Sequence, residues 1–183
     1  MTRRSSTCGG AHSTDVLRKG ALAIDGLERL VHQPDESPTQ PMAIPAGASN
    51  AVLELRGGYL PSLASATAYH ASGAIASNSP SIAGWWRALC AGEIVFQASL
   101  TEMSTFEQAD PHGYGLGMYN PAYGYGPAFG HTGQLLGYMS WAACLPEDEA
   151  VIVVLTNHEV DDGQHLAFSQ GLARPLVDAL RSR

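Results

Sequence analysis

A histidine, a threonine and two glycines stand together in the segment Gly130-His131-Thr132-Gly133. The imidazole of His131, as a cation or a hydrogen-bond donor, and the hydroxyl of Thr132 are groups that bind a carboxylate or an ester dipole. Gly133 has no side chain, so an extended ligand can lie against the chain there as an added β-strand. The segment therefore predicts a binding strand for an acyl compound. The plainer interpretation is a strand followed by a turn glycine.

A nucleophile for this histidine is harder to find. Ser140 lies eight residues beyond Thr132, and together with His131 and either Asp110 or Asp148 it would make a nominal serine triad. Nothing in the spacing supports that grouping, and most chains of this size contain such combinations. We therefore predict no catalytic triad.

A metal site is a further alternative near the end of the chain, where acidic residues and two histidines gather: His158, Glu159, Asp161, Asp162 and His165. The spacing of the histidines matches no zinc-binding helix pattern. A solvated loop that leads into a final helix explains the cluster better, because acidic side chains suit a helix N-terminus. We predict no metal ligand and no cofactor.

The order of motifs in the second half of the chain resembles the serine β-lactamase and penicillin-binding-protein superfamily. The branch is that of class C β-lactamases, D-alanyl-D-alanine carboxypeptidases and related esterases. The segments that carry the resemblance are Ala71–Ser77, Tyr114–Gly117, Gly130–Gly133, Gly137–Ser140, Pro146 and Val153–Asn157. In that superfamily a Lys- or His-[Ser/Thr]-Gly edge strand lines the cleft. The resemblance implies that His131, Thr132 and Gly133 form this wall and that the backbone N–H of Gln134 is an oxyanion-hole donor.

Two other motifs of that superfamily are absent. A Ser-x-x-Lys would supply the nucleophile, but the only lysine, Lys19, has Val16 three residues before it. No tyrosine has an asparagine two residues later. We therefore expect a partial or degenerate serine hydrolase of the β-lactamase, carboxypeptidase or esterase type, with no catalytic residues and no turnover alone. The alternatives are a non-catalytic binding or regulatory module and half of a split enzyme.

The expected fold is α+β: an antiparallel β-sheet flanked by helices, resembling the C-terminal portion of the β-lactamase/transpeptidase-like fold. Residues 1–14 are small and polar and are expected to be disordered. Residues 15–50 are expected to hold a helix and a Pro-rich linker. Residues 51–183 are expected to form the partial β-lactamase-like domain.

Apolar periodicity and capping residues predict four helices. They are Asp15–His32, a helix opened by Ser79-Pro80 and closed at Gly92, Ser99–Phe106, and residues 163–181. Pro175 should kink or break the last helix. Its expected buried face consists of Phe168, Leu172, Leu176 and Leu180.

Short runs of β-branched and apolar residues predict the strands. They are residues 51–59, Tyr114–Tyr119, Ala128–Thr132, Tyr138–Leu145 and Ala150–Thr156, with a loop at 120–127 and a turn at 146–149. The last strand is almost wholly apolar, which predicts a central strand buried on both faces. Trp86 is expected in the core, and Trp85 and Trp141 are expected to be partly exposed. Tyr119, Tyr123 and Tyr125 suggest a loop at a cleft rim.

Composition excludes several classes of partner. The chain has 183 residues and a formal net charge of −7, with ten basic residues spread thinly, so nucleic acid is not expected. No apolar stretch is long enough for a signal peptide or a membrane span, which leaves the compartment open with cytoplasm as the default. The expected partners are a small acyl compound (a β-lactam, a D-alanyl peptide or an ester) and a complementing chain or a homodimer. Cys90 and Cys144 are expected to be buried small apolar residues.

Overall fold

The computed structural model describes residues 7–8, 11–33, 35–45, 68–69, 71–106, 113–122, 124–135, 137–158 and 165–182. The strands are β1 (Thr7–Cys8), β2 (Ala11–His12), β3 (Val31–His32), β4 (Ile75–Ala76), β5 (Phe129–Leu135), β6 (Tyr138–Leu145) and β7 (Ala150–Thr156). The helices are α1 (Ser13–Lys19), α3 (Ser79–Cys90), α4 (Gln97–Met103) and α5 (His165–Arg181), with the 3-10 turn η2 (Pro146–Asp148). These elements confirm the α+β class.

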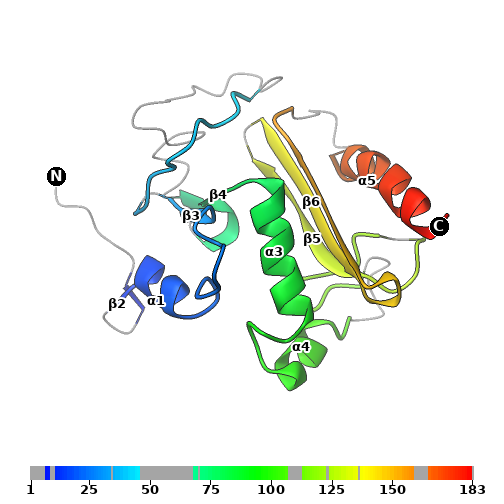
Figure 1. The fold of residues 1–183 in the computed structure, drawn as a ribbon, viewed down its shortest axis with the longest axis horizontal. Helices are drawn as coiled ribbons and strands as arrows, with labels where there is room; N and C mark the ends of the chain where they lie inside the picture. Colours follow the sequence, from blue (N-terminus) through cyan, green and yellow to red (C-terminus); the bar gives the residue numbers. More distant parts are fainter. Residues whose placement is uncertain are drawn as a thin grey trace.

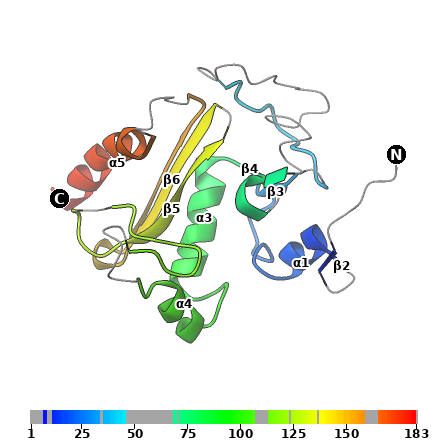
Figure 2. The same ribbon diagram turned by 180° about the vertical axis from the view of Figure 1, so that it is seen from behind.

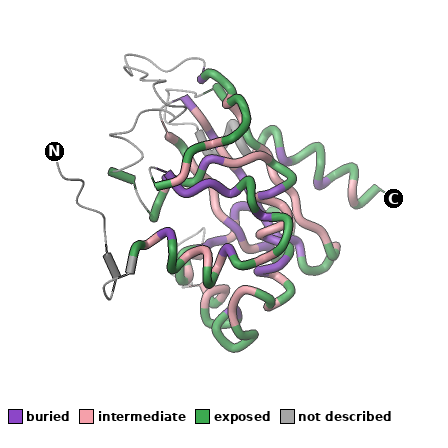
Figure 3. Tube along the Cα trace, turned by 60° about the vertical axis from the view of Figure 1, so that its left-hand side comes forward, coloured by how far each residue is buried: buried purple, intermediate pink, exposed green. Residues whose placement is uncertain are grey.

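The centre of the fold is the three-stranded antiparallel sheet β5-β6-β7. Helix α3 covers one face of the sheet and α5 covers the other, as Figures 1 and 2 show from opposite sides. Two apolar clusters fill the layers. Trp86, Leu89 and Cys144 belong to the cluster on the α3 side, and Trp141 and Val177 to that on the α5 side. Figure 3 shows the buried residues along the strands and the exposed ones on the outer turns of α5.

The two long strands β6 and β7 lie where the sequence predicts them. Their β-branched and small apolar residues suit a pleated surface covered on both faces. The turn between them, with Glu149 in the left-handed conformation at φ 49°, reverses the chain. The expectation that Ala150–Thr156 is the central strand is wrong, however. Among the described strands β6 is central, and β7 lies at the edge with Leu155 38% exposed.

Helix α3 begins and ends close to the predicted residues. The cap is Asn78 rather than the predicted Ser79: the Asn78 side chain accepts a hydrogen bond from the backbone N–H of Ser81 at 3.0 Å. At the other end Gly92 adopts φ 75°, and the N–H groups of Gly92 and Glu93 bond back to Leu89 and Ala88 at 3.0 and 2.9 Å. This pair of bonds is a Schellman motif, which explains why a glycine follows the helix.

The N-terminal part differs from the prediction. Thr7–Cys8 pairs with Ala11–His12 inside the segment that was expected to be disordered, and the predicted helix 15–32 starts earlier and ends at Lys19. Gly20 follows the last residue of this helix, and the low helix propensity of glycine explains why the helix ends there. The strand Val31–His32 then pairs with Ile75–Ala76, a contact far apart in the sequence.

The loop after α1 packs against the described C-terminal part. Leu22, Leu27 and Leu30 form a small apolar cluster with Ile82 and Trp85 of α3. The Trp85 indole also donates to the carbonyl of Ala21 at 2.9 Å. The expected domain boundary at residue 51 and the predicted strand at 51–59 lie outside the described residues, so both stay predictions.

Helix α5 runs through Pro175 without ending. Of the predicted kink or break, the break is wrong because Ala173 and Val177, on either side of the proline, both pack against the sheet at 2% and 1% exposure. The kink stays a prediction. Tertiary packing of this kind outweighs local propensity. The predicted buried face is wrong at Leu172 and Leu176, which are 41% and 48% exposed, and it is confirmed at Leu180, which packs against the core. The side chain of Phe168 lies outside the described residues.

Two corrections concern the core. Cys90 and Cys144, expected as separate apolar residues, form a disulfide between α3 and β6 with 6.6 Å between their Cα atoms. Trp141, expected to be partly exposed, is 1% exposed, because it lies between β6 and α5. Trp86 is in the core, as predicted. Within the described residues, no helix combines the length and apolar character needed to cross a bilayer.

Candidate functional site

Strand β5 carries the predicted binding residues, and its backbone alternates between two partners. Gly130 exchanges both backbone hydrogen bonds with Tyr119, at 2.9 and 3.0 Å, on the side away from β6. Because the peptide groups of a strand alternate in direction, those of Thr132 and Gln134 face the same outer edge as Gly130. The N–H of Gln134 therefore lies on the side where the resemblance expects an oxyanion donor.

The imidazole of His131 is held at both nitrogens. Nδ1 contacts the backbone carbonyl of Thr132, and Nε2 lies 3.0 Å from the hydroxyl of Tyr114. A carbonyl can only accept, so Nδ1 carries the hydrogen. In the neutral ring Nε2 then accepts from the Tyr114 hydroxyl. In the cation Nε2 donates instead, which frees the phenolic proton for another acceptor.

The hydroxyl of Thr132 is held by a second tyrosine. The Tyr119 hydroxyl lies 2.6 Å from Thr132 Oγ1. Burial raises the pKa of Tyr119 above its ordinary value, and the bond to Thr132 offsets only part of that effect. Tyr119 is therefore a neutral phenol at neutral pH, and it fixes the orientation of the threonine hydroxyl.

The two tyrosines and the histidine form an aromatic cluster at the outer edge of β5. The rings of Tyr114 and Tyr119 stack at 5.9 Å, and both meet His131 edge-on, at 5.9 and 5.3 Å. The predicted strand Tyr114–Tyr119 is wrong: a tight turn with Gly117 at φ 74° joins the tyrosines, whose backbones form a single bridge. The turn is what brings both rings to His131.

The two glycines that flank His131-Thr132 have different structural roles. A Cβ on Gly130 would overlap the backbone carbonyl of Ala142, so only glycine fits this register. A Cβ on Gly133 would lie 2.6 Å from the Ser140 hydroxyl on the next strand. The space beside Gly133 is thus taken on that face by Ser140 and is not left wholly to a ligand.

The segment that precedes α3 reaches the far end of β5. A Cβ on Gly73 would lie 3.7 Å from the side chain of Leu135 and 3.4 Å from that of Tyr69. Gly73 belongs to the segment Ala71–Ser77, so this segment of the family resemblance lies beside the end of the strand that carries Gly130–Gly133.

A family model described as Beta-lactamase matches residues 24–173 of the chain. The chain belongs to the beta-lactamase family. The match begins well before the Pro-rich stretch and ends inside α5. No curated protein matches the chain.

Solved structures support the fold of this beta-lactamase family member. The D-amino acid amidase from Ochrobactrum anthropi SV3, complexed with D-phenylalanine, is similar at 22% identity and a TM-score of 0.69, over 96% of this chain and 56% of that chain. Its complex with L-phenylalanine amide gives 23% identity and a TM-score of 0.70, over 94% and 51%. A D-stereospecific amidohydrolase from Streptomyces sp. gives 21% identity and a TM-score of 0.64, over 88% and 48%. The chain spans about half the length of these structures.

Two alternative sites were considered for this beta-lactamase-family chain, a serine triad at Ser140 and a metal site near His158. Asp148 lies at the far end of β6 and pairs with Arg181 at 2.6 Å, so it does not join Ser140 and His131. Asp110 lies outside the described residues. Three acidic residues of the metal alternative, Glu159, Asp161 and Asp162, also lie outside them, as does the side chain of His165. The described part of the chain contains no group of three metal-ligating side chains.

Sequence reasoning missed the part played by Tyr114 and Tyr119. The sequence places Tyr114 in a strand and in the resemblance segment Tyr114–Gly117, and Tyr119 at the end of that strand and at a cleft rim, but it gives neither of them a contact with His131 or Thr132. Gly117, two residues before Tyr119, was the signal that could have predicted this contact. A glycine at that position permits the tight turn that brings Tyr119 back beside Tyr114.

Proposed function

We propose that this chain is the substrate-binding part of a serine hydrolase of the β-lactamase, carboxypeptidase or esterase type, and that it does not turn over substrate alone. The reaction of such an enzyme transfers an acyl group from an amide or ester to a serine and then to water. The observation that supports this role is the outer edge of β5, where the peptide groups of Thr132 and Gln134 face away from β6 beside the Tyr114–His131 pair.

An acyl compound with an extended backbone would add to this edge. Its backbone would bond to the peptide groups of Thr132 and Gln134 as an added strand. The N–H of Gln134 would donate to the carbonyl oxygen on which negative charge develops. The Thr132 hydroxyl would bind the carboxylate or ester of the compound, and the His131 imidazole would bind it through the Tyr114 hydroxyl, whose proton is free for another acceptor when Nε2 donates. In its cationic form His131 would also relay a proton through Tyr114.

The chain's own residues argue against turnover. Its only lysine is Lys19, in α1, and position 16 holds valine where a Ser-x-x-Lys would need serine. Both ring nitrogens of His131 already have partners, so this imidazole is not placed to deprotonate Ser140. The serine nucleophile would therefore come from residues beyond this sequence.

A second candidate is half of a split enzyme, or a binding module that pairs with another chain. The edge position of β7 favours it. This strand is covered on both faces by α3 and α5, yet it has only one described neighbour in the sheet. Apolar edge strands of this kind recruit a further strand.

One set of assays tests these proposals. The chain is incubated with a chromogenic β-lactam, a p-nitrophenyl ester, a fluorescent penicillin and D-phenylalanine amide, the last because the similar structures include D-amino acid amidases. We expect retention of at least one compound without hydrolysis. Thr132→Val should weaken that retention, whereas Thr101→Val on α4, an exposed control, should not.

Each outcome decides between the proposals. Burst acylation of a serine would overturn the absence of a nucleophile. Retention that is unchanged in both Thr132→Val and His131→Ala would remove β5 as the binding strand. Absence of any retention together with a stable dimer or a captured partner strand in sedimentation would favour the split-enzyme proposal.

A further inference from the structure

The edge of β7 that faces away from β6 is apolar along its whole length. Among the described strands, β6 is the one neighbour of β7 in the sheet. No charged residue occurs in Ala150–Thr156, and Leu155 near the end of the strand is 38% exposed. An unpaired strand of this composition is a ready template for another strand.

Helix α5 presents exposed apolar residues on the same side of the molecule. Successive residues of a helix are rotated by about 100°, so Leu172 and Arg174 project to opposite sides of the buried Ala173. The Arg174 guanidinium lies over the Tyr125 ring, in the loop that Tyr119 pairs with β5. Leu172 therefore projects toward the other edge of the sheet, which is β7.

The apolar side of α5 continues beyond this residue. Leu176, one turn after Leu172, is 48% exposed, and Ala179 is also exposed. The charged residues Arg174 and Asp178 project to the opposite flank, by the same rotation. We call the outer edge of β7 together with Leu172, Leu176 and Ala179 the β7 surface. Contiguous exposed apolar groups of this kind indicate an interaction surface.

The β7 strand is complementary to itself when it pairs antiparallel around its midpoint, Val153. In that register Ile152 of one copy faces Val154 of the other, and Val151 faces Leu155. Each facing pair lies on one side of the sheet, because Ile152 and Val154 pack toward α5 whereas Val151 and Val153 pack toward α3. Facing pairs of β-branched and apolar side chains stabilise antiparallel strands.

The two-fold axis of this pairing also brings the two α5 helices together. Helix α5 packs over both β6 and β7, where its cluster includes Ala143 and Ile152. Strands lie about 4.8 Å apart, so an axis half a spacing beyond β7 leaves the two α5 axes about 10 Å apart. Helices in contact lie about 8–10 Å apart. Leu172 and Leu176 of one copy would therefore meet those of the other.

Antiparallel pairing keeps the acidic turns of the two copies apart. Glu147, Asp148 and Glu149 directly precede β7, and the formal net charge of the chain is −7. Glu149 of one copy lies beside Asn157 of the other, which sets the two Glu149 residues about 25 Å apart along the strands. This distance exceeds the Debye length of about 8 Å at physiological ionic strength, so their repulsion is screened. A parallel pair would set the turns side by side.

We propose that the β7 surface binds a second copy of this chain, in a two-fold dimer. The three strands of each copy would then form one continuous antiparallel sheet. The outer edge of β5 lies at the opposite side of each copy and stays free. The dimer therefore does not depend on the function proposed for β5, and it names a partner for the pairing considered as the second candidate.

Sedimentation velocity of the whole chain tests the dimer. We expect dimers at about 100 µM that dissociate on dilution, with a Kd of about 10 µM, as suits a small interface. Leu176→Glu should weaken the dimer at least about tenfold, because it buries a carboxylate against an apolar partner. The matched control is Val16→Glu on α1, at the opposite end of the molecule (Figure 1), where the valine is 47% exposed. It should leave the Kd unchanged.

Engineered thiols test the register, in a Cys8→Ala chain whose other two cysteines form a disulfide. Val153→Cys lies on the two-fold axis, where facing Cα atoms are about 4.5–5.5 Å apart and a disulfide can form. Leu155→Cys is the control, since its two thiols would lie about 13 Å apart along the strands. With oxidised glutathione we expect a covalent dimer of Val153→Cys and none of Leu155→Cys, although position 155 is the more exposed.

The opposite results would overturn the proposal. A chain that stays monomeric at about 100 µM would leave the β7 surface to a strand of a different chain. A dimer unaffected by Leu176→Glu would use another surface, and equal cross-linking of the two cysteine variants would remove the register centred on Val153. The thermal midpoint of Leu176→Glu in dilute solution should match the parent, as should its retention of acyl compounds. These two readouts distinguish loss of the dimer from misfolding and from failure of the β5 proposal.

Discussion

The hydroxyls of Tyr119 and Thr132 face each other across 2.6 Å, and each comes from a different backbone segment at the outer edge of β5. The Tyr119 backbone also pairs with Gly130, so both its main chain and its side chain bind the strand. The loop and the predicted binding strand therefore form one unit. Its stability and its ligand binding should respond together to changes at either residue.

A double-mutant cycle measures that coupling. Thr132→Val leaves the hydroxyl of the buried Tyr119 without its partner, which should lower the free energy of unfolding in urea by about 1–2 kcal/mol. Tyr119→Phe should cost a similar amount, and the double variant clearly less than the sum. The Tyr119 pKa should rise further in Thr132→Val, since the bond to Thr132 lowers it. Additive losses and an unmoved phenol titration would show that the hydroxyls are not coupled.

Alanine substitutions at Gly130 and Gly171 should change the stability of the chain in opposite directions. Gly130→Ala should destabilise the chain by about 2 kcal/mol or more, because the new Cβ meets the backbone carbonyl of Ala142. Gly171→Ala, with open space around its Cβ, should instead stabilise α5 by about 0.5–1 kcal/mol. Thermal midpoints of the two variants give the comparison. A harmless Gly130→Ala would mean that β5 can shift its register against β6.

Sequence patterns predicted those helices and strands that depend on residues close together in the chain. The strand Tyr138–Leu145 and the helix ended by Gly92 follow from alternation and capping, which involve neighbours in the chain. The pairing of Val31–His32 with Ile75–Ala76 could not be predicted this way, because no nearby residue encodes it. The edge position of Ala150–Thr156 likewise depends on which other strands are present.

The same distinction applies to the candidate site. The motif identified His131 and Thr132, but their hydrogen-bond partners depend on a turn that folds Tyr114 and Tyr119 back against β5. On α5, the larger residues Leu172 and Leu176 predicted the wrong buried face. Helix α5 approaches the sheet on its smaller residue Ala173, which leaves room for the bulky Trp141.

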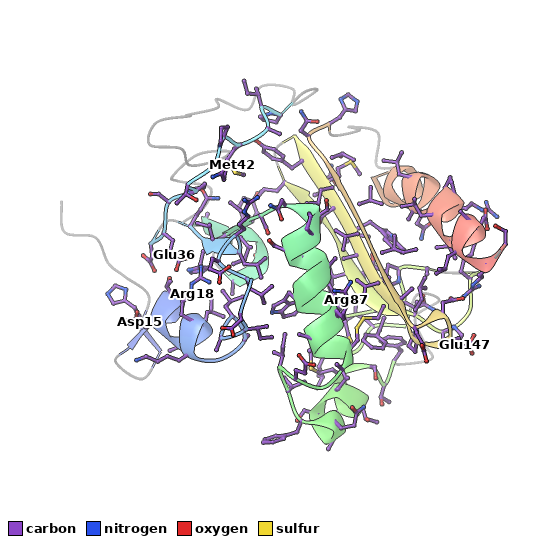
Figure 4. The ribbon with its side chains drawn as sticks, viewed as in Figure 1. Asp15, Arg18, Glu36, Met42, Arg87 and Glu147 are labelled. Atoms are coloured by element: carbon purple, nitrogen blue, oxygen red, sulfur yellow. A yellow bond between two sulfur atoms is a disulfide. The ribbon has the colours of Figure 1, made fainter. Side chains whose placement is uncertain are left out.

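The ion pair between Arg18 and Glu36, at 2.6 Å, predicts a loss of stability in acid (Figure 4). The hydrogen bond from Arg18 holds the pKa of Glu36 below its ordinary value, with a further bond from the backbone N–H of His32. A lowered folded-state pKa means that the contribution is complete above the unfolded value of about 4.3 and is lost as the pH falls below it. Unfolding midpoints between about pH 6 and 3 should thus fall less steeply in Glu36→Gln than in the parent. In Asp15→Asn, which alters an exposed carboxylate of α1, the unfolding midpoint should fall with pH as steeply as in the parent.

The disulfide between Cys90 and Cys144 joins α3 to the central strand, and its two cysteines lie 54 positions apart in the sequence. A cross-link over a loop of this length restricts the unfolded chain, which should stabilise the fold by about 2–4 kcal/mol. Reducing agent should therefore lower the urea midpoint of the parent chain and leave that of Cys90→Ala/Cys144→Ala unchanged. Cys8→Ala is the matched control and should respond to reductant as the parent does. Peptide mapping without reduction should recover the Cys90 and Cys144 peptides joined, and recovery of both as free thiols would contradict the cross-link. The α3 layer would then be held to β6 by packing alone, and reductant would leave the parent midpoint where it was.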